Sequence, residues 1–98
     1  MVQIVWTEPA LAELDAIADY IALDKPAAAR RLVQRILASV GQLERFPALG
    51  SRVPELPKSV YRQLIVKPCR IFYRREEDRV FIVFVMRGER LFQKEFLE

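Results

Sequence analysis

Residues 61–90, YRQLIVKPCRIFYRREEDRVFIVFVMRGER, decide the fold of this chain. They contain three runs rich in β-branched and aromatic residues, Tyr61 to Val66, Arg70 to Arg75 and Arg79 to Met86, which short turn-forming segments separate. Runs of this length and composition are typical of β-strands joined by tight turns. We therefore expect a three-stranded meander whose third strand, apolar on both of its alternating faces, is central and buried.

The part of the chain before this stretch predicts one strand and two helices. Val2 to Trp6 is apolar and mostly β-branched or aromatic, and Thr7 then offers a helix N-cap with Pro9 in the first turn. Apolar residues recur at spacings of three and four as far as about Arg45, with an interruption near Asp24, which is expected to cap the second helix. Two amphipathic helices with so short a link should form an antiparallel hairpin.

Phe46 to Ser59 and Leu91 to Glu98 complete the chain. The first segment contains three prolines and a glycine, so we expect an ordered loop, and its charged residues Arg52, Glu55 and Lys58 become candidates because long loops are often functional. The second segment suits a final helical turn or an edge strand. The predicted fold is α+β, a single domain over residues 1–98 in the order β-α-α-β-β-β, with a helical hairpin packed on a small, mainly antiparallel sheet and a short carboxy-terminal tail.

The composition limits the classes of protein to which the chain can belong. A length of 98 residues suits one compact domain, and a hydrophobic content of 52% is enough to form a core. No apolar run approaches the roughly 20 residues that cross a bilayer, and the amino terminus lacks a signal-peptide pattern, so we expect a cytoplasmic protein without a membrane partner. Cys69 is the single cysteine, which excludes an internal disulfide and a cysteine metal cage and favours a small core residue.

The two halves of the chain differ in net charge. Residues 1–49 carry five Lys/Arg and six Asp/Glu, a net charge of −1, whereas residues 50–98 carry eleven and seven, a net charge of +4. A sheet that gathers this much positive charge is expected to face an anionic partner. The arginines expected to form this basic, partner-binding surface lie at the edges of the predicted strands: Arg62, Arg70, Arg74, Arg87 and Arg90.

Strand alternation sorts the side chains of the second predicted strand. Arg70, Phe72 and Arg74 share one face, which we expect to point toward solvent or a partner, while Tyr73 lies on the opposite face with the helix-packed core. Tyr73 and Trp6 are therefore expected to be core aromatics rather than a catalyst and a base-stacking platform.

The residue types restrict the possible chemistry. The chain has no histidine, and it has neither a phosphate-binding glycine loop, nor metal-ligand spacing, nor a Ser/His/Asp arrangement, so no metal and no cofactor are expected. Arginines could bind phosphates bidentately and stabilise a charged transition state, which leaves a ribonuclease conceivable. Such an enzyme needs a proton acceptor, and arginine, lysine and tyrosine do not have a pKa near neutrality without special tuning.

The order of elements and three sequence segments, VQIVWTEPALAELDAIADYIA, RFPALGSRVPEL and the opening stretch, resemble the RelE/ParE toxin superfamily over essentially the whole chain. The resemblance implies a toxin of a type II toxin-antitoxin pair, neutralised by an antitoxin encoded beside it. The positions that match its motifs are Trp6, Leu11, Leu14, Ile17, Tyr20, Tyr61, Arg62, Arg70 and Tyr73.

The superfamily has two activities on one fold. RelE-like members cleave messenger RNA in the ribosome, and Arg70 matches their sheet arginine while Arg87 or Arg90 approximates a second one. Their lysine cluster and their carboxy-terminal histidine or tyrosine have no counterpart in this chain. ParE-like members inhibit DNA gyrase by binding, which needs no proton shuttle, and the acidic first helix is similar to theirs.

The resemblance therefore favours a ParE-like gyrase inhibitor with no catalytic residue and a ParD-like antitoxin partner. The alternatives are a RelE-like ribonuclease using Arg70, Arg87 and Arg90, and a non-catalytic nucleic-acid-binding or regulatory module, so direct nucleic-acid binding stays open. The antitoxin is expected to cover exposed apolar residues with an acidic, apolar carboxy-terminal segment, and to neutralise the arginines. The candidate apolar contacts are Leu91, Phe92 and Phe96.

Overall fold

The computed structural model describes residues 1–88 and 90–97, so Glu89 in the predicted turn and Glu98 at the end of the predicted tail lie outside the described residues. Its helices are α1 (Glu8–Ala22) and α2 (Pro26–Gly41), followed by the 3-10 turn η1 (Gln42–Glu44). Its strands are β1 (Gln3–Trp6), β2 (Ser51–Arg52), β3 (Arg62–Val66), β4 (Cys69–Glu76) and β5 (Arg79–Arg87), and the tail contains the 3-10 turn η2 (Lys94–Leu97).

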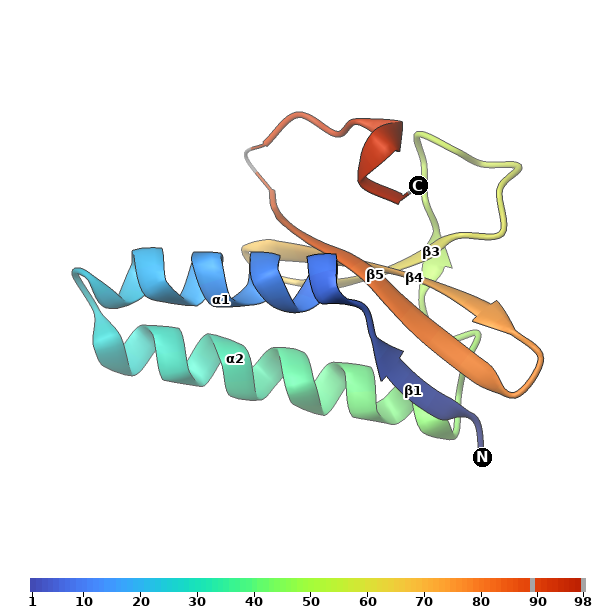
Figure 1. Cartoon of the computed structure of the whole chain (residues 1–98), viewed down its shortest axis with the longest axis horizontal. Helices are drawn as coiled ribbons and strands as arrows, with labels where there is room; N and C mark the ends of the chain where they lie inside the picture. Colours follow the sequence, from blue (N-terminus) through green and yellow to red (C-terminus); the bar gives the residue numbers. More distant parts are fainter. Residues whose placement is uncertain (89, 98) are drawn as a thin grey trace.

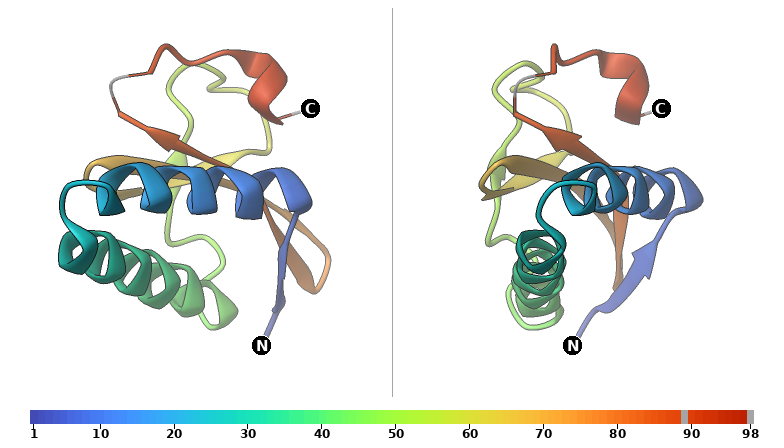
Figure 2. Two further views of the ribbon diagram at one scale, coloured as in Figure 1. Left: turned by 60° about the vertical axis from the view of Figure 1, so that its left-hand side comes forward. Right: turned by 90° about the vertical axis from the view of Figure 1, so that its left-hand side faces the viewer.

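The five strands form one sheet in the order β1-β5-β4-β3-β2. The strand β1 runs parallel to β5, and every other neighbouring pair is antiparallel. Because β5 pairs on both sides, the prediction of a buried central strand is confirmed, and so is the α+β fold class. The two helices lie side by side on one face of the sheet, while the tail lies on the other (Figures 1 and 2).

Local sequence explains how the helical hairpin begins and where one expectation fails. The Thr7 hydroxyl accepts a hydrogen bond from the Ala10 N–H (3.4 Å) and donates one to the Ile82 carbonyl (2.8 Å), so the predicted N-cap also fixes the start of α1 to β5. The expected cap of α2 by Asp24 is wrong. Lys25, one residue later, occupies the N-cap position and makes no side-chain capping bond, because its ammonium group has no acceptor for a backbone N–H.

The sheet is buried on both faces. Between the sheet and the helices lies the helix-side core, which includes Ile36, Ile71 and Tyr73, and Trp6 packs against it as a partly buried residue. Cys69, exposed by 1%, also lies there, as expected. The opposite face carries the tail-side core: Val53, Phe72, Val83, Phe84, Met86 and Leu97, with Leu56, Tyr61, Phe81, Phe92 and Phe96 packed around it.

Phe72 is the clearest difference between prediction and structure. It was expected on a face open to solvent or a partner, but it is fully buried, because the tail folds back over this face of the sheet. A β-bulge adds to the same core: Phe72 pairs with Phe84 and Tyr73 with Ile82, which leaves Val83 as an extra residue in β5. Val83 and Phe84 therefore both face the tail.

The carboxy-terminal tail contains a helical turn, one of its two predicted forms, and is bonded to the sheet by Tyr61. The Tyr61 hydroxyl donates a hydrogen bond of 2.7 Å to the Leu97 carbonyl. We expect Tyr61→Phe to lower the free energy of unfolding by about 1 kcal/mol, because one partly buried hydrogen bond is lost while the ring stays. Hydrogen exchange should show faster exchange at the Phe96 amide, which bonds to the Gln93 carbonyl, than at amides of β5. Equal acceleration throughout the sheet would contradict a local role.

Candidate functional site

The structure separates the five candidate arginines. Arg70 and Arg74 lie on the tail side of β4, and Arg90, which follows β5, also contacts the tail. Arg87 lies against Tyr20 of α1, on the helix side of the sheet. Arg62 shares the helix-side face of β3 with Leu64 and Val66, and it donates a hydrogen bond of 2.7 Å to the Gly50 carbonyl. The tail face therefore gathers three of the five candidates.

Arg70 has the most ordered surroundings of the three. Its Nε and Nη2 donate to Gln63 Oε1 at 2.9 and 2.7 Å, and its Nη1 and Nη2 donate to the two carboxylate oxygens of Glu55 at 2.9 and 2.7 Å. The guanidinium lies over the rings of Phe72 and Phe92, 4.9 and 5.6 Å from their centroids. A bidentate fork is a strong and geometrically specific way for arginine to bind an anion, and the cation–π contacts hold the guanidinium in place.

The contact with Arg70 changes the pKa of Glu55. The hydrogen bond from Arg70 lowers the pKa of the Glu55 carboxyl below its ordinary value of 4.5, while partial burial opposes this effect. A carboxyl with a lowered folded-state pKa stabilises the fold above its unfolded pKa, and that contribution disappears as the pH falls through the folded value.

We therefore expect Glu55→Gln to destabilise the fold at neutral pH and to have little effect on stability at acidic pH. At about pH 7 the variant should unfold more easily than the wild type, and the difference in unfolding free energy should shrink below about pH 4.5. Denaturant titrations of both proteins at several pH values measure this difference. A difference that stayed constant or grew on acidification would contradict the assignment.

Arg74 and Arg90 each also contact a carboxylate and an aromatic ring, but their ion pairs are longer than that of Arg70. Arg74 Nη2 lies 3.2 Å from Glu76 Oε2, and its guanidinium is 4.7 Å from the centroid of Phe81. Arg90 Nη1 lies 3.3 Å from Glu13 Oε2, and its guanidinium is 4.8 Å from the Phe96 centroid. Each arginine of the tail face thus has a carboxylate within the same chain.

Sequence reasoning missed two residues of this site. Gln63, exposed by only 7%, anchors Arg70, and Glu13 pairs with Arg90 from 77 positions away. A polar residue inside an apolar strand was the available signal for Gln63. Nothing local pointed to Glu13, because its partner is set by the way α1 crosses β5.

Some of the candidate residues from the loop and the tail contact the tail face, and others do not. Glu55 joins the site, whereas Arg52 donates to the Ser59 carbonyl at 3.0 Å and Lys58 is exposed. In the tail, Leu91 is 86% exposed, but the two phenylalanines pack inward. Phe92 is 5.5 Å from the Phe72 ring, and Phe96 stacks on Phe84 at 4.5 Å.

Tyr73 of β4 and Tyr61, the residue before β3, have structural roles. The Tyr73 hydroxyl accepts from the Gly50 N–H at 2.8 Å and donates to the Pro47 carbonyl at 3.0 Å, and burial raises the pKa of this phenol above 10.0. Tyr61 is bonded to Leu97. Both hydroxyls are bonded to backbone groups, and Glu55, the carboxylate bound to Arg70, has a lowered pKa that makes it a weak base, so the arrangement suits binding of an anion better than proton transfer.

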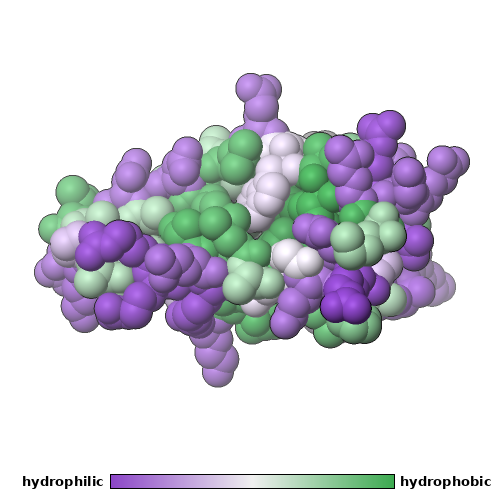
Figure 3. All heavy atoms as spheres, turned by 90° about the horizontal axis from the view of Figure 1, so that it is seen from below, coloured by the Kyte–Doolittle hydropathy of each residue, from purple (hydrophilic) through white to green (hydrophobic). Residues whose placement is uncertain are grey.

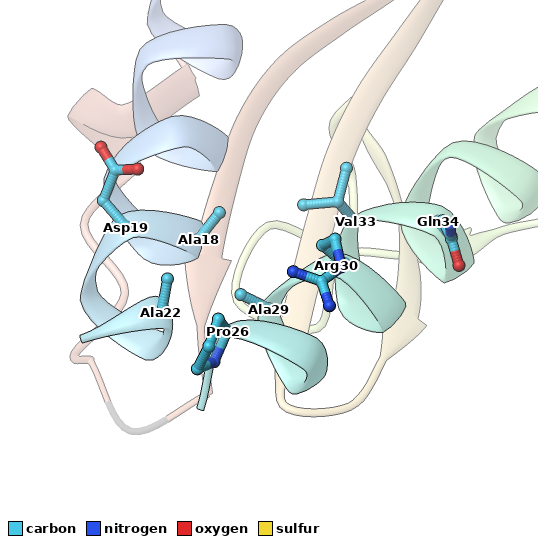
Figure 4. Close-up of a pocket in the computed structure, with 8 residues that line it drawn as sticks. All are labelled: Ala18, Asp19, Ala22, Pro26, Ala29, Arg30, Val33 and Gln34. Carbon is cyan, nitrogen blue, oxygen red and sulfur yellow. The ribbon is translucent and has the colours of Figure 1, made fainter. Parts of the chain in front are cut away.

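A hollow of about 420 Å³ opens between α1 and α2. Figure 4 shows its alanines and Pro26 on the walls, with the polar side chains of Asp19 and Arg30 on opposite helices. Its lining offers no nucleophile beside a general base. Within residues 1–88 and 90–97, no group of His, Cys, Asp or Glu has the size needed to hold a metal ion, and no helix there is long and apolar enough to cross a membrane.

Known proteins resemble this chain over most of its length. The family model described as the ParE toxin of the type II toxin-antitoxin system parDE matches residues 4–92. "Toxin RelE2" of Caulobacter vibrioides is 36% identical over 92 residues, covering 93% of this chain and 100% of that protein. "Putative toxin Y4kP" of Sinorhizobium fredii is 43% identical over 83 residues, covering 83% and 82%. A solved structure titled as the chromosomal ParDE system from P. aeruginosa has a TM-score of 0.77 at 26% identity, covering 91% of this chain and 98% of that one.

Proposed function

Because this chain belongs to the ParE toxin family of type II toxin-antitoxin systems, we propose that it inhibits DNA gyrase by binding in the cytoplasm and is neutralised by a cognate ParD-like antitoxin. One observation carries the choice of binding over cleavage: the arginines of the tail face have aromatic rings and carboxylates around them, and the nearby tyrosines are bonded to backbone groups. Binding needs charge and shape, and it needs no proton acceptor.

Purified gyrase tests this proposal directly. The wild-type protein should block supercoiling of relaxed plasmid, and it should leave messenger RNA intact in a translation extract. Normal supercoiling in the presence of excess toxin would refute the proposed target. Retardation of DNA without either effect would instead support a nucleic-acid-binding or regulatory module.

A RelE-like ribonuclease is the second candidate, because one relative of known sequence carries the name "Toxin RelE2". In that function Arg70, Arg87 and Arg90 would act on the messenger. The separation of Arg87 from the other two by the sheet argues against a shared site. Messenger cleavage in the extract that is lost in Arg70→Ala would favour this candidate over gyrase inhibition.

Exposed apolar residues support an antitoxin partner. Viewed from below, the molecule shows hydrophobic residues gathered in the middle of the face, with hydrophilic residues at both ends (Figure 3). An apolar, acidic segment that covered such residues and met the basic half of the chain would combine hydrophobic burial with charge complementarity. Large hydrophobic side chains exposed on the described part of the molecule include Leu11, Leu23, Leu37, Phe46, Leu49, Val60, Ile65 and Leu91.

A further inference from the structure

We propose that Arg70 is a preformed receptor for a carboxylate of a partner protein, and that Glu55 fills this receptor as an exchangeable internal ligand while the toxin is unbound. The inference rests on the proposed function in one respect, since it takes the partner to be the acidic segment of the antitoxin. It adds the site at which that segment is recognised and the residue that it displaces.

The receptor is fixed independently of Glu55. Gln63, which is almost fully buried, accepts two of the guanidinium hydrogen bonds, and the guanidinium lies over the ring of the fully buried Phe72, 4.9 Å from its centroid. Phe92 contributes a second ring at 5.6 Å. Since β3, β4 and the tail hold the guanidinium, its outer edge stays in place when Glu55 leaves, and a planar fork remains for another carboxylate.

Glu55 has the properties of a ligand that can leave. Its side chain is 38% exposed, against 17% for that of Arg70, and it belongs to the segment between β2 and β3, which has no regular secondary structure. Because the Glu55 side chain is partly exposed, water can solvate its carboxylate when it leaves the fork. Replacement of one carboxylate by another restores the same two hydrogen bonds.

The surroundings favour an acidic protein segment over a phosphate chain. Leu56, next to Glu55, and Phe92, over the guanidinium, both belong to the tail-side core, so the rim of the receptor is apolar. A nucleic-acid track needs a row of uncovered cations. The other arginines of this face have their own carboxylates, Arg74 with Glu76 and Arg90 with Glu13.

Glu55→Gln tests the exchange, with Glu76→Gln as the matched control because it removes the same charge from the neighbouring Arg74 pair. The probe is a fluorescein-labelled twelve-residue peptide of alternating Glu and Ala, followed by anisotropy at low salt. If Glu55 occupies the receptor for about nine-tenths of the time, its removal should tighten peptide binding about tenfold, whereas the control should stay within about twofold of the wild type.

Three further measurements complete the test. Glu55→Asp keeps the net charge and shortens the side chain, so it should give an intermediate gain; it also serves if Glu55→Gln is poorly folded by circular dichroism. Adding Arg70→Lys to Glu55→Gln should abolish the gain, because lysine cannot form the bidentate fork. A peptide with Gln in place of Glu should show no gain.

Equal affinities in Glu55→Gln and Glu76→Gln, or no gain in either Glu55 variant, would overturn the proposal. A gain for a twelve-nucleotide single strand in place of the peptide would also overturn it, by making the receptor one for phosphate. The peptide assay contains no gyrase, so its failure beside blocked supercoiling would refute the receptor alone. Success beside normal supercoiling would refute the gyrase target alone.

Discussion

Gly50→Ala is expected to lower the free energy of unfolding by about 3 kcal/mol, the largest effect expected for alanine at any of the three glycines. A Cβ atom at Gly50 would lie 2.5 Å from the Gln63 carbonyl oxygen and 2.8 Å from the ring and hydroxyl of Tyr73. Neither group can move away cheaply. The Gln63 carbonyl belongs to β3, and the Tyr73 hydroxyl is bonded to both Gly50 and Pro47. Urea unfolding followed by circular dichroism measures the change.

Gly41→Ala is the matched control. The same methyl group at Gly41, the last residue of α2, would have no atom within 4 Å apart from its chain neighbours and the backbone of its own helix. Alanine is a better helix former than glycine, so this variant should be unchanged or more stable by up to about 1 kcal/mol. Equal destabilisation by the two substitutions would mean that the close approach at Gly50 does not explain its effect.

Phe72→Ala is expected to cost about 3–5 kcal/mol, because it removes a fully buried ring and leaves a cavity between the sheet and the tail. Arg70 would lose one of its two aromatic contacts, so binding of anionic probes should weaken in the same variant. The measurement is again the unfolding free energy, made at a pH where Glu55 is ionised.

Phe46→Ala provides the comparison for this substitution. Phe46 is 60% exposed, so its truncation should change the unfolding free energy by no more than about 0.5 kcal/mol. A small effect of Phe72→Ala, close to that of Phe46→Ala, would show that the tail does not cover this face in solution.

Phe72 also shows where the sequence was a sufficient guide and where it was not. Strong local patterns predicted the elements correctly: both faces of Arg79 to Met86 are apolar, and the structure makes β5 (Arg79–Arg87) a strand paired on both sides. The face of Phe72 was misjudged because alternation assigns a side chain to a face but does not say what covers that face. Here the cover is the tail, whose packing depends on contacts far away in sequence.

Two smaller differences have similar causes. The strand β2 (Ser51–Arg52) was predicted as loop, because a pair of residues beside prolines carries no periodic signal, and its pairing with β3 decides its conformation. The bulge at Val83 also escaped prediction, since a continuous apolar run gives no sign of where the alternation slips.

The candidate site was predictable in its residue types more than in its geometry. Arg70, Arg74 and Arg90 do lie together on the tail side, yet Arg62 and Arg87 lie on the helix side. The internal carboxylates are what the sequence could least reveal. Contacts such as that between Arg90 and Glu13 arise only when α1 and the end of β5 have been brought together in the folded chain.

The parallel pairing of β1 with β5 has a consequence for synthesis of the protein. Gln3 stands opposite Arg79, so β1 can join the sheet only after β5 has left the ribosome. The helical hairpin depends on local contacts and can form much earlier, whereas closing so long a loop is slow and costs chain entropy. We expect a nascent chain to lack this edge of the sheet until β5 has emerged, which postpones the assembled domain well beyond the formation of the helical hairpin.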